Sequence, residues 1–412
     1  MTRRRHLPGL DGLRAVGALF VLSTHVGFHS GDSLNSSFNG LLSRMDSGVT
    51  IFFVISGFLL YQPHVEALVH GRRRPSTRRY FLHRALRILP ALWVAVIGAA
   101  LVLPHDEDVS LRNYLLHASL TQIYVPGHET NGLTQMWSLA TEAAFYLALP
   151  LLAWVLARSG RGDAGLRRRA LVLCATPLVG AAWMALANGW GRPLWTLWLP
   201  AFIGWFGLGM ALAAWRVGRA TAALGRSWID TLAEHPGTAW AVAAALYLVL
   251  ASPVAGPYDL LPPTAGQAAV KNLLYGLFGV LIVLPAVAPR PEGAPSLAIQ
   301  VLGSAPARFL GNISYGIFCY HLIALGLVER MLDFEIFTGG FARLFWPTLG
   351  LSLVLATVSY YLMERPIMRL GRRRSSSADR PARGPGDLPD SDGDAATATG
   401  EQARATPVNA SA

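Results

Sequence analysis

The sequence predicts an all-α protein, a polytopic bundle of transmembrane helices. Hydrophobic residues make up 52% of the 412 residues and charged residues only 14%, whereas soluble domains carry about 25% charged residues. The mean hydropathy is positive, at +0.38. Long apolar segments alternate with short arginine-rich connections. These features are typical of an integral membrane protein, so we expect it to lie in the lipid bilayer of the cell (plasma) membrane as a multi-pass protein.

Ten apolar segments are long enough to cross a hydrocarbon core about 30 Å thick. The second and the seventh of them are the shortest. An even number of spans would place both termini on the same side of the membrane. The predicted spans cover residues 10–28, 48–62, 86–104, 137–157, 170–187, 195–215, 238–252, 271–288, 308–328 and 345–364.

Arginine clusters such as Arg3–Arg5 and Arg72–Arg74 precede the first span and follow the even-numbered spans. Cytoplasmic loops are enriched in basic residues, so this pattern predicts that both termini are cytoplasmic. Residues 1–370 then form one transmembrane domain. Residues 371–412, rich in small and polar residues, form a disordered cytoplasmic tail. These clusters also account for the net charge of +11, so no nucleic-acid partner is expected.

Lysine and cysteine are rare in this chain. Lys271 is the only lysine, a usage that we attribute to genomic composition. Cys174 and Cys319 both lie inside apolar segments, which predicts buried thiols and no disulfide.

The first span carries two ionisable residues, Arg14 and His25, with ten residues between them. Eleven helical positions return to within about 20° of the starting direction, so both side chains share one face, about 16 Å apart along the axis. A charged side chain in a bilayer costs at least about 2.5–3.5 kcal/mol. The pair therefore suggests a site that two reactants approach from opposite sides. The alternative is that His25 is an interhelical hydrogen-bonding group.

Two further ionisable residues, Glu142 and His321, fall at a similar outer depth on the fourth and ninth predicted spans. Glu142 could orient an imidazole and fix its tautomer, or it could be a structural carboxylate paired with a neighbouring helix. His321 could support the site or simply satisfy a hydrogen bond. No two histidines stand four residues apart within a predicted span, so no metal site is predicted.

Arg84 and Arg87 stand three residues apart at the start of the third span, hence on one face. Together with Arg14 they could bind anionic phosphates through bidentate contacts, or they could be membrane anchors of the cytoplasmic side. Ser56 and Gly57 form a small-residue spot in an aromatic segment. That spot would permit close helix packing or the passage of an acyl chain.

Six sequence blocks that contain these residues resemble the membrane-bound acyltransferase-3 family, and they occur in the family's order across residues 7–370. The resemblance covers all of the chain except the tail. The blocks are LDGLRAVGALFVLSTHVGF around Arg14 and His25, FFVISGFLL, HRALRILPALW, WSLATEAAFYL, ISYGIFCYHL and SYYLMERP.

The resemblance implies a ten-span integral membrane O-acyltransferase. Such a protein moves an acyl group, usually acetyl, from cytoplasmic acyl-CoA to a hydroxyl of a carbohydrate, a cell-envelope glycan, a glycolipid or a macrolide-like metabolite. Acyl-CoA is then a co-substrate, and no cofactor is bound. The residue matching His25 is implied to be catalytic, and those matching Arg14, Arg84 and Arg87 contact the acyl donor. Because of its depth in the membrane, we predict Glu142 as a second catalytic residue, which would orient the imidazole of His25. His321 and Ser56 are possible supporting residues.

Two questions remain open at this level. His25 could act as a general base on the acceptor hydroxyl, or as a nucleophile that forms an acyl-histidine. A secondary transporter or flippase of an anionic or acylated metabolite is the alternative function, because many spans and buried ionisable groups fit both.

Overall fold

The computed structural model describes residues 7–104, 109–127, 129–258, 261–289 and 296–377, with the side chains of residues 372–377 left out. Throughout these ranges the regular secondary structure is helical. The prediction of a polytopic helical bundle is therefore confirmed. The Arg3–Arg5 cluster and residues 378–412 of the predicted tail lie outside the described residues.

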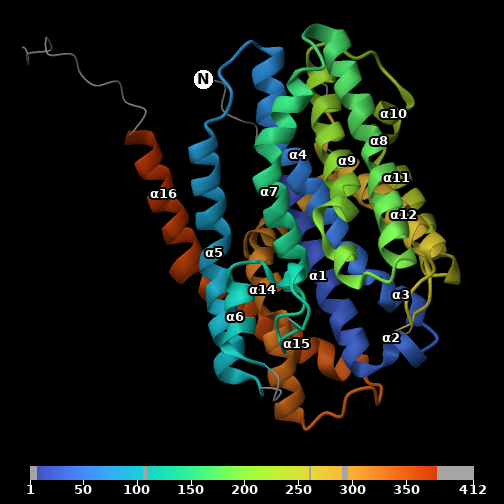
Figure 1. Cartoon of the computed structure of the whole chain (residues 1–412), viewed down its shortest axis with the longest axis vertical. Coiled ribbons are helices and arrows are strands. Elements are labelled where there is room, and N and C mark those ends of the chain that lie inside the picture. Colours follow the sequence, from blue (N-terminus) through green and yellow to red (C-terminus); the bar gives the residue numbers. More distant parts are fainter. Residues whose placement is uncertain (1–6, 105–108, 128, 259–260, 290–295, 378–412) are drawn as a thin grey trace, which may run out of the picture.

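Long helices run roughly parallel to one axis, and most of the shorter ones lie toward the two ends (Figure 1). The long helices are α1 (Pro8–Ser30), α4 (Gly48–Val69), α5 (Thr77–Val102), α7 (Met136–Ala157), α8 (Gly162–Gly189), α9 (Leu199–Ala220), α11 (Pro236–Leu250), α12 (Ala265–Val287), α14 (Ala305–Leu332) and α15 (Phe341–Ser359). The short ones are α2 (Asp32–Asn35), α3 (Asn39–Ser43), α6 (Leu111–Ala118), α10 (Trp228–Glu234), α13 (Leu297–Leu302) and α16 (Arg365–Ser377). Helix α16 runs beside α5.

Among the described residues, eight helices are long and apolar enough to cross a membrane, and they cover eight of the ten predicted spans except for residues 103, 104 and 288. The other two predicted spans also form helices, α1 and α11, but differ in character. Helix α1 has 23 residues and carries Asp11, Arg14 and His25. Helix α11 has 15 residues, a length of about 22 Å, which is less than the hydrocarbon thickness. Length and composition therefore support eight of the ten spans.

Helix α1 lies inside the bundle, in contact with α4, α12, α14 and α15. Small residues permit this close approach. A Cβ atom on Gly311 of α14 would lie 2.2 Å from the carbonyl oxygen of Asp11, and one on Gly48 of α4 would lie 2.5 Å from that of Gly17. Enclosure by protein gives the ionisable residues of α1 polar neighbours instead of lipid.

Helices α4 and α9 cross with their backbones in near contact. A Cβ on Gly57 would lie 2.1 Å from the carbonyl oxygen of Phe206, and one on Gly209 would lie 2.1 Å from that of Val54. Gly57 therefore serves helix packing, which was one of the two interpretations of the small-residue spot. Beside this crossing, the ring of Phe206 stacks between those of Phe53 and Phe145, at centroid distances of 4.3 Å and 4.0 Å.

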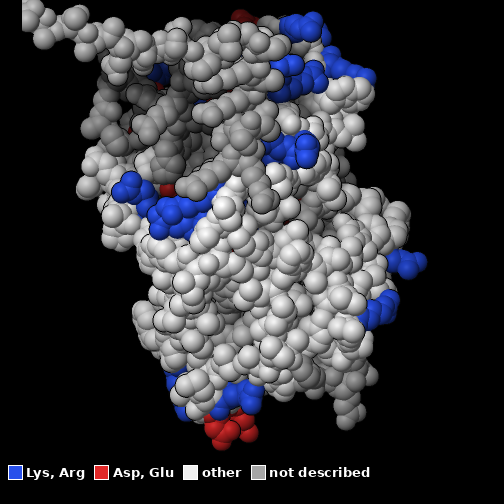
Figure 2. All heavy atoms as spheres, turned by 90° about the vertical axis from the view of Figure 1, so that its left-hand side faces the viewer, with Lys and Arg blue, Asp and Glu red and all other residues white. Residues whose placement is uncertain are grey.

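Charged side chains are distributed unevenly along the bundle. On the face shown in Figure 2, most of the basic atoms lie in the upper part of the view, and a cluster of acidic atoms lies at its lower end. Helix α16 continues to Ser377, seven residues beyond the boundary predicted at residue 370. The cytoplasmic location of both termini stays a prediction.

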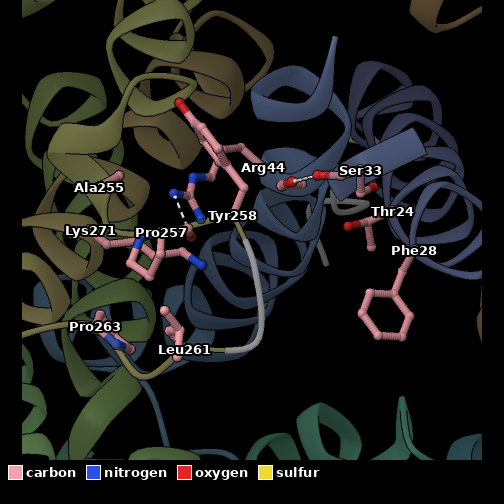
Figure 3. Close-up of a pocket in the computed structure, with 11 residues that line it drawn as sticks. Thr24, Phe28, Ser33, Arg44, Ala255, Pro257, Tyr258, Leu261, Pro263 and Lys271 are labelled. Carbon is pink, nitrogen blue, oxygen red and sulfur yellow. Dashed lines mark hydrogen bonds between the residues drawn. The ribbon is translucent and has the colours of Figure 1, made fainter. Parts of the chain in front are cut away.

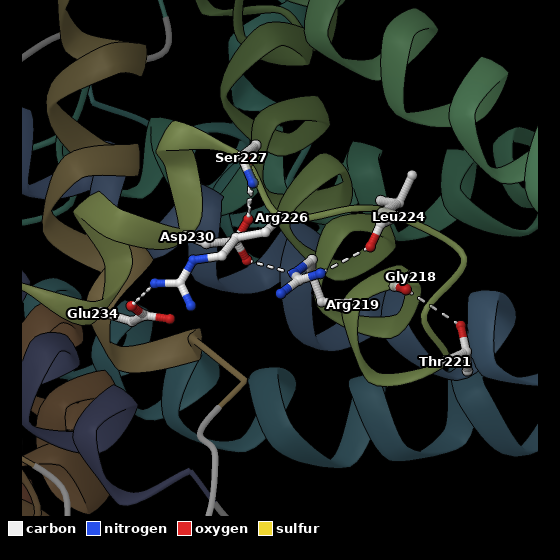
Figure 4. A network of polar contacts seen from close by, with 8 residues as sticks. All are labelled: Gly218, Arg219, Thr221, Leu224, Arg226, Ser227, Asp230 and Glu234. Carbon is white, nitrogen blue, oxygen red and sulfur yellow. Dashed lines mark hydrogen bonds and ion pairs between the residues drawn. The ribbon is translucent and has the colours of Figure 1, made fainter.

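An ion-pair network ties α10 to the end of α9 (Figure 4). Arg219 Nε donates to Asp230 at 2.6 Å, the backbone N–H of Ser227 donates to the same carboxylate at 2.8 Å, and Arg226 pairs with Glu234. Burial alone would raise the pKa of Asp230, but the hydrogen bonds from Ser227 and Arg219 outweigh it and hold that pKa below its ordinary value.

We predict that this network stabilises the protein in a pH-dependent manner. Because the folded-state pKa of Asp230 is depressed, its contribution is complete above the unfolded-state value of about 3.9 and is lost as the pH falls through the folded-state pKa. The thermal midpoint of D230N in nanodiscs should lie below that of the parent at neutral pH, and the difference should shrink below about pH 4. D163N, at an exposed aspartate of α8, serves as the control. A difference that grows on acidification would contradict this account.

Candidate functional site

Five predicted site residues line one cavity between α1, α4, α5, α7 and α14: Arg14, Ser56, Arg84, Arg87 and Glu142. Its volume is about 80 Å³. We call it the arginine cavity. Three guanidinium groups face a single carboxylate among its lining residues, so the cavity carries an excess of positive charge. That excess favours a ligand with several negative charges.

Tyrosine rings hold two of the three guanidinium groups. Arg84 lies over the ring of Tyr146 and Arg87 over that of Tyr315, each at 5.7 Å from the centroid. The hydroxyl of Tyr315 donates to the carbonyl oxygen of Ile88 at 2.7 Å, which fixes that ring. A cation–π contact orients a guanidinium without neutralising its charge. Sequence reasoning missed both tyrosines, although each stands in a block that carried the family resemblance.

Glu142 accepts hydrogen bonds from Ser56 and from the hydroxyl of Tyr146, the latter at 2.7 Å. The hydroxyl of Tyr80 in turn donates to the backbone oxygen of Tyr146 at 3.1 Å. We expected Glu142 to lie beside His25. The structure places it with the arginines instead, because the rotation of α7 turns its carboxylate toward α4 and α5. Ser56 thus contributes a hydrogen bond next to the packing glycine.

The two predicted histidines, His25 of α1 and His321 of α14, come together. Their ring centroids are 5.1 Å apart and the rings are tilted by 43°. His321 is fully buried, and its Nδ1 donates to the carbonyl oxygens of Phe318 and Ile317 at 2.8 Å and 3.2 Å. Its Nε2 is buried without a hydrogen-bond partner in the described part of the chain. The tautomer that donates at Nδ1 therefore leaves an acceptor at Nε2.

An aromatic wall separates this imidazole pair from the arginine cavity. Phe52 and Phe318 both line the cavity, and their rings meet edge to face at 6.4 Å. The ring of Phe318 also lies 6.2 Å from that of His321. A thin, flexible group that passes the wall would reach the imidazoles directly.

A second histidine of α1 adds to the site. Helix α1 extends to Ser30, beyond the predicted end at residue 28, so His29 stands one turn after His25. The Nδ1 of His29 donates to the carboxylate of Glu329 at 2.6 Å. Sequence reasoning missed this residue because the predicted span ended one residue too early.

Comparison with known proteins places this geometry in context. A family model described as an acyltransferase domain matches residues 7–364. The chain belongs to the acyltransferase-3 family. This membership confirms the resemblance, makes the protein a membrane acyltransferase, and favours acyl transfer over transport.

Relatives within the acyltransferase-3 family differ in length. Nodulation protein 10 of Rhizobium leguminosarum bv. viciae is 27% identical over 401 residues, which cover 89% of this chain and 94% of that protein. Peptidoglycan O-acetyltransferase OatA of Listeria monocytogenes is 23% identical over 387 residues, which cover 89% of this chain but only 57% of that protein. No solved structure matches the chain.

We predict that the ring of His321 carries its proton on Nδ1 at neutral pH, because two backbone carbonyls face that nitrogen. Nitrogen-15 spectra of histidine-labelled protein in nanodiscs check this. The signals missing from the spectrum of H321Q should be those of a ring protonated on Nδ1. The control is H70Q, which lacks an exposed histidine, and the signals missing from its spectrum identify that other ring. Loss of an Nε2-protonated ring in H321Q would overturn the assignment.

Proposed function

We propose that this protein is an acyl-CoA-dependent O-acyltransferase of the cell membrane. It transfers an acetyl group to a hydroxyl of a carbohydrate, a cell-envelope glycan or a related metabolite. The observation that carries the proposal is that Arg14, Arg84 and Arg87 converge on one cavity, separated only by an aromatic wall from the paired imidazoles of His25 and His321.

The arginine cavity suits the donor. Coenzyme A carries several phosphate groups, and guanidinium groups bind phosphates through charge-assisted, bidentate hydrogen bonds. The phosphates would dock at Arg84 and Arg87, near the start of α5, with Arg14 closest to the pantetheine arm. That arm is thin and flexible enough to pass between Phe52 and Phe318. The thioester would then stand next to His25.

The chemical step is a direct transfer. His25 accepts the proton of the acceptor hydroxyl while the hydroxyl oxygen attacks the thioester carbonyl. The carbon–sulfur bond breaks, and the CoA thiolate leaves and takes up a proton. His321, whose Nε2 accepts, steadies the imidazolium that forms on His25. Glu142 acts at a distance from this step, by holding Tyr146 under Arg84.

Peptidoglycan is the acceptor that the name of OatA gives for that relative. Nodulation protein 10, which matches this chain over nearly its whole length, has a name that gives no acceptor. A glycan hydroxyl is thus the acceptor class that we propose here.

We predict that R84Q and R87Q each raise the KM for acetyl-CoA by about 10- to 100-fold, the loss expected when a hydrogen bond between charged groups is removed. The KM for the acceptor should stay within about twofold, since these side chains lie on the donor side of the wall. Radiolabelled acetyl transfer to a panel of chitotetraose, maltotetraose and a muramyl disaccharide measures both.

The matched control is R78Q, because Arg78 is an exposed arginine at the start of the same helix. Its KM for acetyl-CoA should remain that of the parent. An equal rise in R78Q and R84Q would mean that the arginines act only through the general surface charge.

We predict that H25A lowers the rate of acetyl transfer by about 10²- to 10⁴-fold, the contribution of a general base. Its abundance in the membrane and its thermal midpoint should stay close to those of the parent, because the ring of His25 is half-buried and not part of the tight core. H70A, at an exposed histidine, is the control for loss of an imidazole as such.

Two outcomes would oppose this mechanism. Undiminished transfer by a normally inserted H25A would exclude the role of His25. An acetyl group recovered on His25 by peptide mass spectrometry, after incubation with acetyl-CoA alone, would replace direct transfer by an acyl-histidine intermediate.

A further inference from the structure

We infer that a second cavity, at the opposite end of α1, is the subsite for the acceptor, where Asp46 and Lys271 bind neighbouring hydroxyls of a sugar ring. The inference rests on the proposed function. The cavity has a volume of about 260 Å³ and lies among α1, α2, α3 and the segment before α12 (Figure 3). That volume is close to the lower end of the range for small-molecule sites, about 300–1,000 Å³.

The position of this cavity fits an acceptor. Thr24 and Phe28 of α1 line it, and they flank His25 in the sequence. The arginine cavity contains Arg14 of the same helix, three turns earlier. Along α1, the arginine cavity thus lies before His25, and the second cavity lies at the level of His25. An alcohol held here approaches the imidazole from the side that the thioester leaves open.

Hydroxyl groups are frequent in the lining. Thr24, Ser33, Ser43 and Tyr258 all contribute to it. Figure 3 shows Thr24 and Phe28 on one side of the space and Lys271 on the other. The hydroxyls of Ser43 and Tyr258 already donate to backbone carbonyl oxygens, and each can still accept a hydrogen bond from a sugar hydroxyl. The aromatic ring of Phe28 offers an apolar surface to the carbon–hydrogen face of a pyranose.

Lys271, which lines the cavity, forms a charged pair with Asp46, which is not itself a lining residue. Lys271 donates to Asp46 Oδ2 at 3.1 Å, and Tyr275 donates to Oδ1 of the same carboxylate. The side chains of Lys271 and Asp46 are nevertheless 28% and 40% exposed, so both can reach a ligand. A carboxylate that accepts and an ammonium that donates, side by side, match two neighbouring hydroxyls.

The choice of lysine at this position supports a ligand-binding role. Lys271 is the only lysine among 35 basic residues, so a compositional preference would have placed arginine here as well. The ammonium of Lys271 has three donors, and Asp46 accepts from one of them. Lysine therefore keeps hydrogen-bonding capacity for a third group.

The cationic groups of this cavity already have hydrogen-bond acceptors. Arg44 is buried and donates to the carbonyl oxygens of Leu250, Gly256 and Pro257. Lys271 is paired with Asp46. Few donors are thus left for a ligand, and a neutral polyol is a better match than the phosphate of an anionic lipid, which binds through several charge-assisted donors.

The test compares K271M with the parent protein in nanodiscs. The substrates are acetyl-CoA and one glycan from the panel named under the proposed function, namely the glycan that the parent acetylates fastest. We expect K271M to raise the KM for the glycan by about 10- to 100-fold, the loss of a charged hydrogen bond. The KM for acetyl-CoA should stay within about twofold, which also shows that K271M is folded. R226M, which removes the cation of the exposed Arg226–Glu234 pair, should change neither constant.

The outcomes separate this inference from the function on which it rests. If the parent acetylates no glycan of the panel, the proposed function fails. If the parent does so and K271M has an unchanged KM for that glycan, the subsite fails alone. A second result would also exclude the subsite. In it, K271M has an unchanged KM for the glycan, and dioleoyl phosphatidylglycerol in the nanodisc raises the thermal midpoint of the parent but not that of K271M. That result would assign the cavity to a lipid headgroup.

Discussion

An arginine and a histidine on one helix of membrane-spanning length set the constraint on which the rest of this structure depends. Facing lipid, a charged side chain costs at least about 2.5–3.5 kcal/mol. The chain meets the constraint by enclosing α1 within α4, α12, α14 and α15. Glycines such as Gly17 and Gly311 allow the backbones of these helices to approach each other closely. The helix that carries the chemistry is therefore also the one around which the bundle is built.

The two ends of α1 differ in the partners that hold their cationic side chains. Around Arg14, tyrosine rings orient Arg84 and Arg87 and leave their charge in place, which suits a polyanionic donor. At the other end, backbone carbonyls occupy Arg44 and a carboxylate pairs with Lys271, which suits a neutral acceptor. Basic residues thus line two different cavities. They have aromatic partners in one, and carbonyl and carboxylate partners in the other.

Between the two ends lie an aromatic wall and a pair of imidazoles. The wall lies between the arginine cavity and the imidazoles, while the buried Nε2 of His321 leaves one acceptor close to His25. Next along α1, His29 and its partner Glu329 continue the row of titratable groups. His29 and Glu329 thus lie beyond His25 along α1, on the side away from Arg14.

The sequence by itself determined the helical membrane class, the common face of Arg14 and His25, and the adjacency of Arg84 and Arg87. These features depend on hydrophobicity and on the period of a single helix, which are local properties. Tertiary structure decided what no single helix contains: that Glu142 joins the arginines and not His25, that Tyr146 and Tyr315 hold the guanidinium groups, and that Lys271 meets Asp46 from a distant segment. The rotation of one helix against another is fixed by the packing of all their side chains together. Depth in the membrane can therefore suggest which side chains lie at the same level. Only the assembled bundle determines which of them are in contact.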